Sequence, residues 1–160
     1  MSRGTPYPGG MEIRNPSDRT AVQQGYSGPL RVSAAFADIE LGMTVQVDNT
    51  VVGGHVKPLL DTELGRYVGI CIGTRFSGLD DYGHAPRAGE LALIALATCE
   101  VKVKVAGVLG FGNSIQPGPT PGTVIAWVSG QSLIGQTIEA TTATSDLVNA
   151  LMFPLQRDVT

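Results

Sequence analysis

The sequence has few charged residues and no long apolar run. Asp, Glu, Lys and Arg together make up 16% of its 160 residues, where an ordinary soluble domain has about 25%. The longest uninterrupted apolar stretch, Leu91 to Ala97, is far shorter than the roughly 18 residues that a membrane helix requires. The opening residues, MSRGTPYPGG, contain no apolar segment of the kind found in secretion signals. We therefore expect a chain that does not enter a membrane.

Cysteine is also scarce, with only Cys71 and Cys99 in the chain. Two cysteines without CxxC spacing form neither a disulfide framework nor a zinc module. Both lie in apolar runs, GICIG and LATCE, where a free cysteine acts as a small hydrophobic residue. We expect two free thiols and a reducing compartment, with a single disulfide as the alternative.

The net charge of −3 excludes the strongly basic footprint of a nucleic-acid-binding domain. We therefore expect no direct contact with nucleic acid. The charge is unevenly distributed, because residues 1–31 carry a net charge of +2 and residues 32–160 carry −5. A weakly basic arm on an acidic body favours contact between the arm and an acidic surface.

The first segment also lacks a periodic apolar pattern. Prolines and the Gly9-Gly10 pair interrupt it, and proline fixes φ and removes backbone donors. We predict an extended N-terminal arm over residues 1–31 that becomes ordered on a partner surface, followed by a folded domain over residues 32–160. A disordered terminus without a role is the alternative. The arm residues expected to bind the partner are Arg3, Tyr7, Met11, Ile13, Arg14, Arg19 and Tyr26.

Beyond the arm, short apolar runs are separated by Gly, Pro and Asp. Several runs alternate with a period of two, as in MTVQVD and RYVGICIG, while long stretches of helical period are missing. Such runs indicate β-strands. We predict an all-β domain, a small β-barrel or sandwich of about seven to nine strands. The expected strand segments are residues 43–48, 51–52, 55–60, 66–73, 90–106, 123–129, 136–140 and 147–155.

The sequence contains little that would support catalysis. It has no GxSxG, HExxH or Walker motif. Its histidines are His55, beside a Gly-Gly bend, and His84, in the loop DDYGH. That loop is the best metal candidate, but its spacing matches no calcium or zinc motif. The glycines of AGVLGFGNS, residues 106–114, have the spacing GxxGxG and indicate a turn rather than a phosphate loop. We expect no enzyme, no metal and no cofactor.

Two features admit both a structural and a binding role. The alternate lysines of VKVKV, residues 101–105, are either a cationic strip for an acidic partner or the solvated face of a strand. Trp127 lies in an apolar strand segment. There a role in the core or in a subunit contact is expected rather than a role as a ligand platform.

The second half has a distinctive order of segments: RYVGICIGTRF, GELALIALATCEVKVKVAGVLGFGNSIQPG, TVIAWVSG and IGQTIEATTATSDLVNALMFPL. This order, together with the earlier segment DIELGMTVQV, resembles the small capsid decoration, or cement, proteins of tailed bacteriophages. The resemblance covers roughly residues 36–155 and leaves the arm unmatched. The chain departs from the family pattern at Asn113, where an acidic residue is usual, and at Ser145-Asp146, where Gly-Asp is usual.

The resemblance implies a non-enzymatic virion protein on the outer surface of the capsid. Such proteins are often homotrimers that lie over junctions between major capsid protein subunits and reinforce the shell against internal DNA pressure. The arm of residues 1–31 would then act as a latch that lengthens a partner's β-sheet by strand addition. The main alternative is a β-barrel module of a virion that binds carbohydrate or the host surface. Another structural virion component, or an enzyme that uses the DDYGH loop, are further alternatives.

Overall fold

The computed structural model describes residues 30–32, 38–52, 54–74, 85–95, 100–142 and 146–157. Within these ranges the chain forms ten β-strands, and a 3-10 turn at Leu64–Arg66 is the one helical element. The all-β prediction is confirmed. The strands outnumber those expected because Leu30–Val32 and Ser114–Pro117 also form strands. In addition, the segment 90–106 contains two strands instead of one.

The first half of the chain forms a closed barrel, called barrel 1. Its strands are β1 Leu30–Val32, β2 Thr44–Val47, β3 His55–Pro58, β4 Tyr67–Thr74 and β5 Leu91–Ala95. Neighbouring strands follow the order β1-β3-β2-β4-β5. β1 closes the ring because it pairs in parallel with β3 and antiparallel with β5. The remaining pairs are antiparallel.

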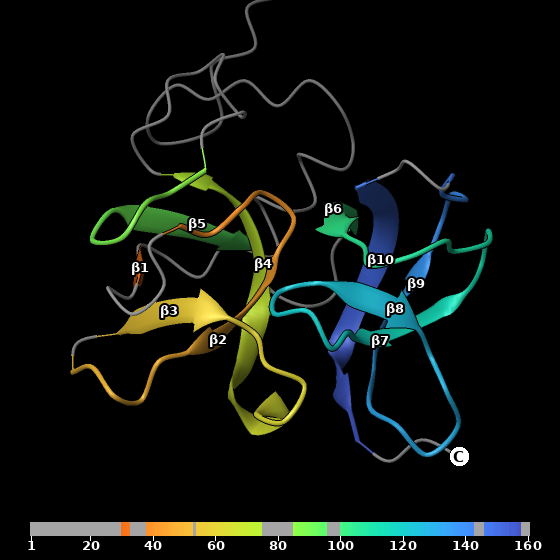
Figure 1. Cartoon of the computed structure of the whole chain (residues 1–160), viewed down its shortest axis with the longest axis horizontal. Helices are drawn as coiled ribbons and strands as arrows, with labels where there is room; N and C mark the ends of the chain where they lie inside the picture. The colour runs from red at the N-terminus through yellow and green to blue at the C-terminus, as the bar shows by residue number, and fades with distance from the viewer. Residues whose placement is uncertain are drawn as a thin grey trace, which may run out of the picture.

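The second half forms another ring, called barrel 2, beside the first (Figure 1). Its strands are β6 Glu100–Lys104, β7 Ser114–Pro117, β8 Val124–Ala126, β9 Leu133–Thr137 and β10 Leu147–Gln156. They form a five-stranded antiparallel sheet in the order β6-β10-β9-β7-β8. The two edges of this sheet meet, because Val105 forms a parallel bridge with Val124. The Ala106 N–H also donates a hydrogen bond to the Val124 carbonyl at 3.0 Å.

Barrel 2 repeats the topology of barrel 1. When β1 to β5 are matched in order with β6 to β10, every pair of neighbouring strands has its equivalent except β1 with β3, since β6 and β8 are the two edges of their sheet. The parallel pairing of β1 with β3 has its counterpart in the parallel bridge that joins the chain after β6 to β8. The described part of the chain therefore contains two consecutive copies of one five-stranded unit.

The register of the strands repeats as well. Facing pairs in barrel 1 and their counterparts in barrel 2 are Gln46–Lys57 and Gln116–Ile125, Thr44–Ile70 and Ser114–Gln136, and Cys71–Ile94 and Thr137–Ala150. Gly69 lies against the Ala95 carbonyl, and its counterpart Gly135 lies against the Leu151 carbonyl. A side chain at either glycine would collide with that carbonyl, so both places require a residue without a Cβ.

A glutamine side chain makes the same contact in both barrels. Gln46 Oε1 accepts a hydrogen bond from the Leu60 N–H at 2.7 Å. Its counterpart, Gln116 Oε1, accepts one from the Val128 N–H at 2.8 Å. Each bond fixes the chain that leaves the third strand of its barrel. Topology, register and a side-chain contact are thus shared, which is the pattern of an internally duplicated unit.

One hydrophobic cluster extends from barrel 2 into barrel 1. The interior of barrel 1 has its own cluster, made of Ile39, Val45, Val56, Cys71, Ala92 and Ile94. The larger cluster fills barrel 2 and includes Ile70 and Ala95, which belong to β4 and β5 of barrel 1. Both side chains are fully buried. Burying an isoleucine contributes about 2 kcal/mol, so this shared cluster favours a single folded unit.

Backbone hydrogen bonds also join the two barrels. The Thr44 N–H donates to the Gly122 carbonyl at 2.8 Å, and the Gly122 N–H donates to the Leu59 carbonyl at 2.9 Å. The Lys104 N–H donates to the Gly42 carbonyl at 2.8 Å. The β7–β8 loop of barrel 2 therefore inserts between β2 and the chain that follows β3. We call this set of contacts the barrel joint.

Candidate interaction surface

The residues predicted to bind a partner through the arm lie outside the described residues: Arg3, Tyr7, Met11, Ile13, Arg14, Arg19 and Tyr26. The DDYGH loop with His84, and Cys99, lie outside them too. The predicted boundary after residue 31 falls within β1, which pairs with β3 and β5. The last residues of the predicted arm therefore form a wall strand of barrel 1.

Exposed apolar side chains occur on neighbouring segments of barrel 2. Phe111 is 76% exposed, Val128 59%, Leu151 40% and Ile138 38%. Groups of large exposed apolar residues mark interaction surfaces, whereas single ones are normal on any protein. These four residues, together with the half-buried Trp127, are called the end face.

Hydrogen bonds and strand register bring the segments of the end face together. The Gly112 N–H, next to Phe111, donates to the Thr137 carbonyl at the end of β9 at 3.0 Å. Leu151 of β10 faces Gln136 of β9. The Gln136 Nε2 group donates in turn to the Gly112 carbonyl at 2.8 Å. The β6–β7 connection and β9 lie on the side of barrel 2 that is turned away from barrel 1 (Figure 1).

The glycine-rich connection that carries Phe111 is held by hydrogen bonds within the protein. The Leu109 N–H donates to Thr141 Oγ1 at 2.6 Å, and the Gly110 N–H donates to Asn113 Oδ1 at 2.6 Å. The Gly112 N–H, the third backbone donor of this connection, donates to the Thr137 carbonyl of β9. A phosphate would need these donors free, so the geometry agrees with the predicted turn. The turn also fixes the position of Phe111.

Trp127 and Val128 are positioned by the chain that leaves β8. The Trp127 N–H donates to the Ser114 carbonyl at 2.8 Å, and its indole Nε1–H donates to the Gln131 carbonyl at 2.9 Å. The side chain of Trp127 is half-buried, unlike the four exposed residues of the end face. This position is not that of a core residue, and the role in a subunit contact stays a prediction.

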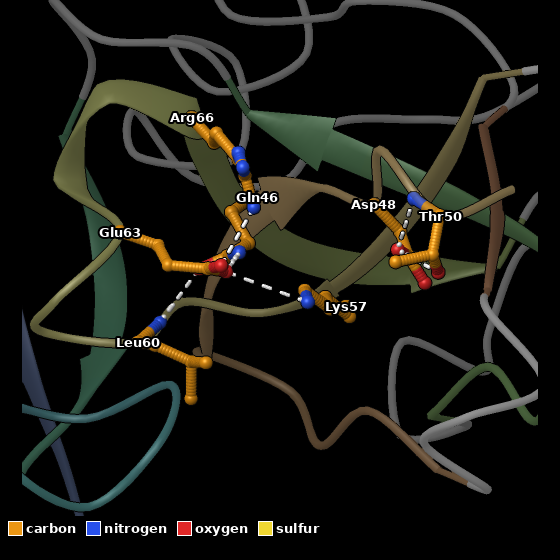
Figure 2. Close-up of polar contacts among 7 residues, drawn as sticks. All are labelled: Gln46, Asp48, Thr50, Lys57, Leu60, Glu63 and Arg66. Atoms are coloured by element: carbon orange, nitrogen blue, oxygen red, sulfur yellow. Dashed lines mark hydrogen bonds and ion pairs between the residues drawn. The ribbon is translucent and has the colours of Figure 1, made fainter.

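Barrel 1 contains a polar cluster around the buried Gln46 (Figure 2). Its Nε2 group donates to Glu63, while its Oε1 accepts from the Leu60 N–H as described above. Glu63 also pairs with Arg66 Nη1 at 2.6 Å and with Lys57 Nζ at 3.4 Å. Both carboxylate oxygens of Glu63 therefore contact groups of the same chain.

The pKa of Glu63 is lowered from its ordinary value of 4.5, chiefly by the hydrogen bond from Gln46 and further by Lys57 and Arg66, against the effect of desolvation. A carboxylate with a low pKa is a weak general base. Its contacts instead tie the 3-10 turn Leu64–Arg66 to β2 and β3. We interpret the cluster as a structural one.

Two further features singled out in the sequence have structural places. Cys71 lies inside barrel 1, and burial raises the pKa of its thiol to about 12. It is therefore protonated and inert at neutral pH. Lys102 is exposed, as a solvated strand face predicts, but Lys104 is only partly exposed and forms an ion pair with Glu40 across the barrel joint.

Among the described residues, no group of three or more His, Cys, Asp or Glu side chains is arranged to hold a metal ion. No helix in the described part of the chain has the length and apolar character needed to cross a membrane. A scan against protein-family models and a search of curated proteins both gave no match. The end face is the described feature that points most directly to a function.

The residues of the end face other than Trp127 were not predicted from the sequence. Strand alternation does not distinguish an apolar side chain in a core from one on a surface. The signal that would have found Phe111 is the repetition of ELGMTVQV, residues 40–47, as GFGNSIQP, residues 110–117. In this repetition Phe111 is the counterpart of Leu41. Leu41 lies beside the barrel joint, next to Gly42.

Proposed function

We propose that this chain is a non-enzymatic decoration protein that binds the outer surface of a phage head. There it stabilises contacts between major capsid protein subunits as a homotrimer. The observation that carries the proposal is the apolar end face on a unit of two β-barrels. A protein partner removes such a surface from water. The resemblance of residues 36–155 to capsid decoration proteins supports the capsid and sister chains as partners.

The end face is suited to a lasting contact because it is ordered before binding. Phe111 lies on a turn whose backbone donors are bonded, and Val128 is fixed through Gln116. Little conformational entropy is then lost when the partner binds. The low content of charged residues also limits the cost of desolvating the surface.

The arm supplies a second contact in the proposed function. Residues 1–29 directly precede β1, so their C-terminal end is attached to the wall of barrel 1. They include the cationic residues Arg3, Arg14 and Arg19. An arm anchored in this way would add a strand to a capsid sheet while the barrels rest on the lattice. Two linked contacts bind more tightly than either alone, through effective concentration.

Binding to empty heads tests the proposal. Heads assembled from the major capsid protein of the virus that carries this gene are mixed with the purified chain and sedimented. We expect saturable co-sedimentation and a higher temperature for head disruption. A variant lacking residues 1–28 is expected to fold and to bind at least about tenfold more weakly. Failure of the full chain to sediment with the heads at micromolar concentrations would overturn the proposal.

The alternative function, a module that binds carbohydrate or the host surface, predicts a different outcome. Such a module stays in the supernatant of the head assay and binds glycans on an array or the surface of host cells. Binding to glycans without binding to heads would therefore replace the capsid proposal with this one.

A further inference from the structure

Equivalent faces of the two barrels differ in what covers them. Ile70 and Ala95 of barrel 1 pack into the cluster that fills barrel 2 and are fully buried. Their counterparts in barrel 2, Gln136 and Leu151, are exposed. The same face of the repeated unit is thus closed in barrel 1 and open in barrel 2.

The whole end face follows this rule. Each of its residues is more exposed than its counterpart in barrel 1, and the pairs are Phe111 with Leu41, Trp127 with Leu59, Val128 with Leu60, Ile138 with Ile72 and Leu151 with Ala95. All ten of these side chains are apolar or aromatic. In barrel 1, barrel 2 packs against the surface that is equivalent to the end face. In barrel 2, the end face itself is not covered by another barrel within the described residues.

The element that covers barrel 1 has a counterpart too. Gly122, in the β7–β8 loop, exchanges backbone hydrogen bonds with Thr44 and Leu59. Its equivalent is Gly54 in the β2–β3 loop, and both glycines have a left-handed backbone, with φ of +77° and +73°. Gly54 is exposed, and Val52 in the same loop is 97% exposed. The β2–β3 loop is thus presented outward, and its Gly54 has the backbone conformation that Gly122 has in the barrel joint, although this loop is longer than the β7–β8 loop.

The backbone groups that would receive this loop are also present. The Ser114 N–H and the Trp127 carbonyl are the counterparts of the Thr44 N–H and the Leu59 carbonyl. Among the described loops and turns, no backbone group is bonded to these two groups as Gly122 is bonded to Thr44 and Leu59. The Ser114 N–H and the Trp127 carbonyl lie next to the apolar side chains of the end face. The hydrogen-bonding groups and the apolar surface that a second barrel joint would need are therefore close together.

We propose that the end face of one chain binds barrel 1 of a second copy of the same chain. In this contact the β2–β3 loop of the second copy, residues 48–52 and Gly54, lies beside β7 of the first copy. The arrangement is equivalent to that of the β7–β8 loop beside β2 within one chain. The occupant is a second copy because each chain already contains one example of this joint. Two different surfaces meet, so the assembly either closes into a ring or continues as a series. The inference does not depend on capsid binding.

The mass of the full-length chain in solution, measured by light scattering behind a sizing column, tests the inference. We expect a closed ring with a mass near three times 16.7 kDa, and a concentration-dependent series of larger masses would also support head-to-tail contact. Phe111→Glu places a charge in the apolar contact and is expected to give monomers. The matched variant Phe111→Leu keeps an apolar side chain and is expected to assemble.

A mixing experiment distinguishes this contact from a symmetric one. Val52→Glu, on the inserting loop, is also expected to give monomers. Phe111→Glu retains an intact loop and Val52→Glu retains an intact end face, so an equimolar mixture should form a dimer and nothing larger. Both positions are exposed, so circular dichroism and the thermal midpoint should match those of the wild-type chain.

Three results would overturn the inference. One is a monomeric wild-type chain at high micromolar concentration, as expected if other residues of the same chain cover the end face. Another is an oligomer that Phe111→Glu leaves unchanged. The last is a mixture of the two variants that stays monomeric. Each is read in solution without heads, so it tests the contact between copies, which the homotrimer of the proposed function shares, and is independent of whether the chain binds heads.

Discussion

Among single residues, Gln46 shows how a polar group is kept inside this fold. A fully buried amide is tolerated when its nitrogen and its oxygen both have hydrogen-bond partners. Gln46 meets this condition by accepting from the Leu60 N–H and donating to Glu63. Its counterpart Gln116 is half-buried and makes the first contact, with Val128, but has no carboxylate at the position of Glu63. The duplication thus provides an internal comparison for one side-chain contact.

Substitution of these two glutamines should have unequal effects. Gln46→Ala is expected to lower the free energy of unfolding by about 2–3 kcal/mol, because it leaves buried groups without partners. Gln116→Ala is expected to lower it by about 1 kcal/mol or less. Urea unfolding followed by circular dichroism measures both. Equal losses at the two positions would mean that the contact with Glu63 adds nothing.

The lowered pKa of Glu63 predicts a pH-dependent contribution to stability. Because the folded-state pKa lies below the ordinary 4.5, the contribution is present above that value and is lost as pH falls through the folded-state pKa. Glu63→Gln should therefore be less stable than the wild type at pH 7. The difference should shrink as pH falls below about 4.5 and disappear in stronger acid.

Urea unfolding at pH 7 and pH 3 measures this difference. Asp61→Asn is the matched control, since Asp61 is exposed in the neighbouring turn and forms no ion pair among the described residues. We expect the control to be nearly neutral at both pH values. A Glu63→Gln difference that is the same at both would show that the carboxylate charge does not stabilise the fold.

At the scale of elements, β1 is a short strand that completes a barrel. It comprises only Leu30–Val32, yet it joins β3 to β5 and closes barrel 1. Without it, both neighbours would present an open edge. The predicted arm is therefore continuous with a strand on which the first barrel depends.

Two N-terminal truncations should separate the arm from this strand. Removal of residues 1–28 leaves β1 intact and should change the thermal midpoint by about 2 °C or less, while removal of residues 1–32 should lower it by about 10 °C. Differential scanning calorimetry measures both midpoints. If the longer truncation melts like the shorter one, closure by β1 contributes little to stability.

The sequence predicted the element type well and the partition into barrels poorly. Period-2 runs predicted β2, β4 and β10 nearly as observed. Burial alternates along β10, but in β2 the successive residues Thr44, Val45 and Gln46 are all buried and Val47 is exposed. The strand Ser114–Pro117 was missed because its glycine and proline neighbours indicated a turn. The duplication was also missed, since few residues are identical between the copies. Counterparts such as Gly42 and Gly112, or Gln46 and Gln116, are retained where a turn or a contact needs that residue.

At the scale of the whole molecule, the barrel joint explains why equivalent residues differ. Ile70 faces barrel 2 and is apolar, whereas its counterpart Gln136 is exposed and polar. The Leu59 carbonyl accepts the hydrogen bond from Gly122, whereas its counterpart Trp127 is a half-buried residue of the end face. The residue differences between the two barrels thus correspond to the difference in burial: the face of barrel 1 is covered, and the equivalent face of barrel 2 is exposed.

Exchanging the residue types at positions 70 and 136 tests whether coverage by a second barrel explains the difference between them. Ile70→Gln places an amide in the joint and should lower the free energy of unfolding by about 3 kcal/mol, through lost burial and an unsatisfied polar group. Gln136→Ile gives the end face the residue of the covered face. Its lost hydrogen bond to the Gly112 carbonyl is exposed and costs about 1 kcal/mol or less.

If a second copy covers the end face as barrel 2 covers barrel 1, burial of the new isoleucine adds about 1.5–3 kcal/mol to each contact. The dissociation constant for self-association of Gln136→Ile should then fall by at least about tenfold. Sedimentation equilibrium over a range of chain concentrations measures this constant. The exposed variant Gln131→Ile, on the turn after Val128, is the control for a general increase in surface hydrophobicity. An unchanged constant for Gln136→Ile, or an equal fall for both variants, would show that the open face is not a site where the joint is repeated.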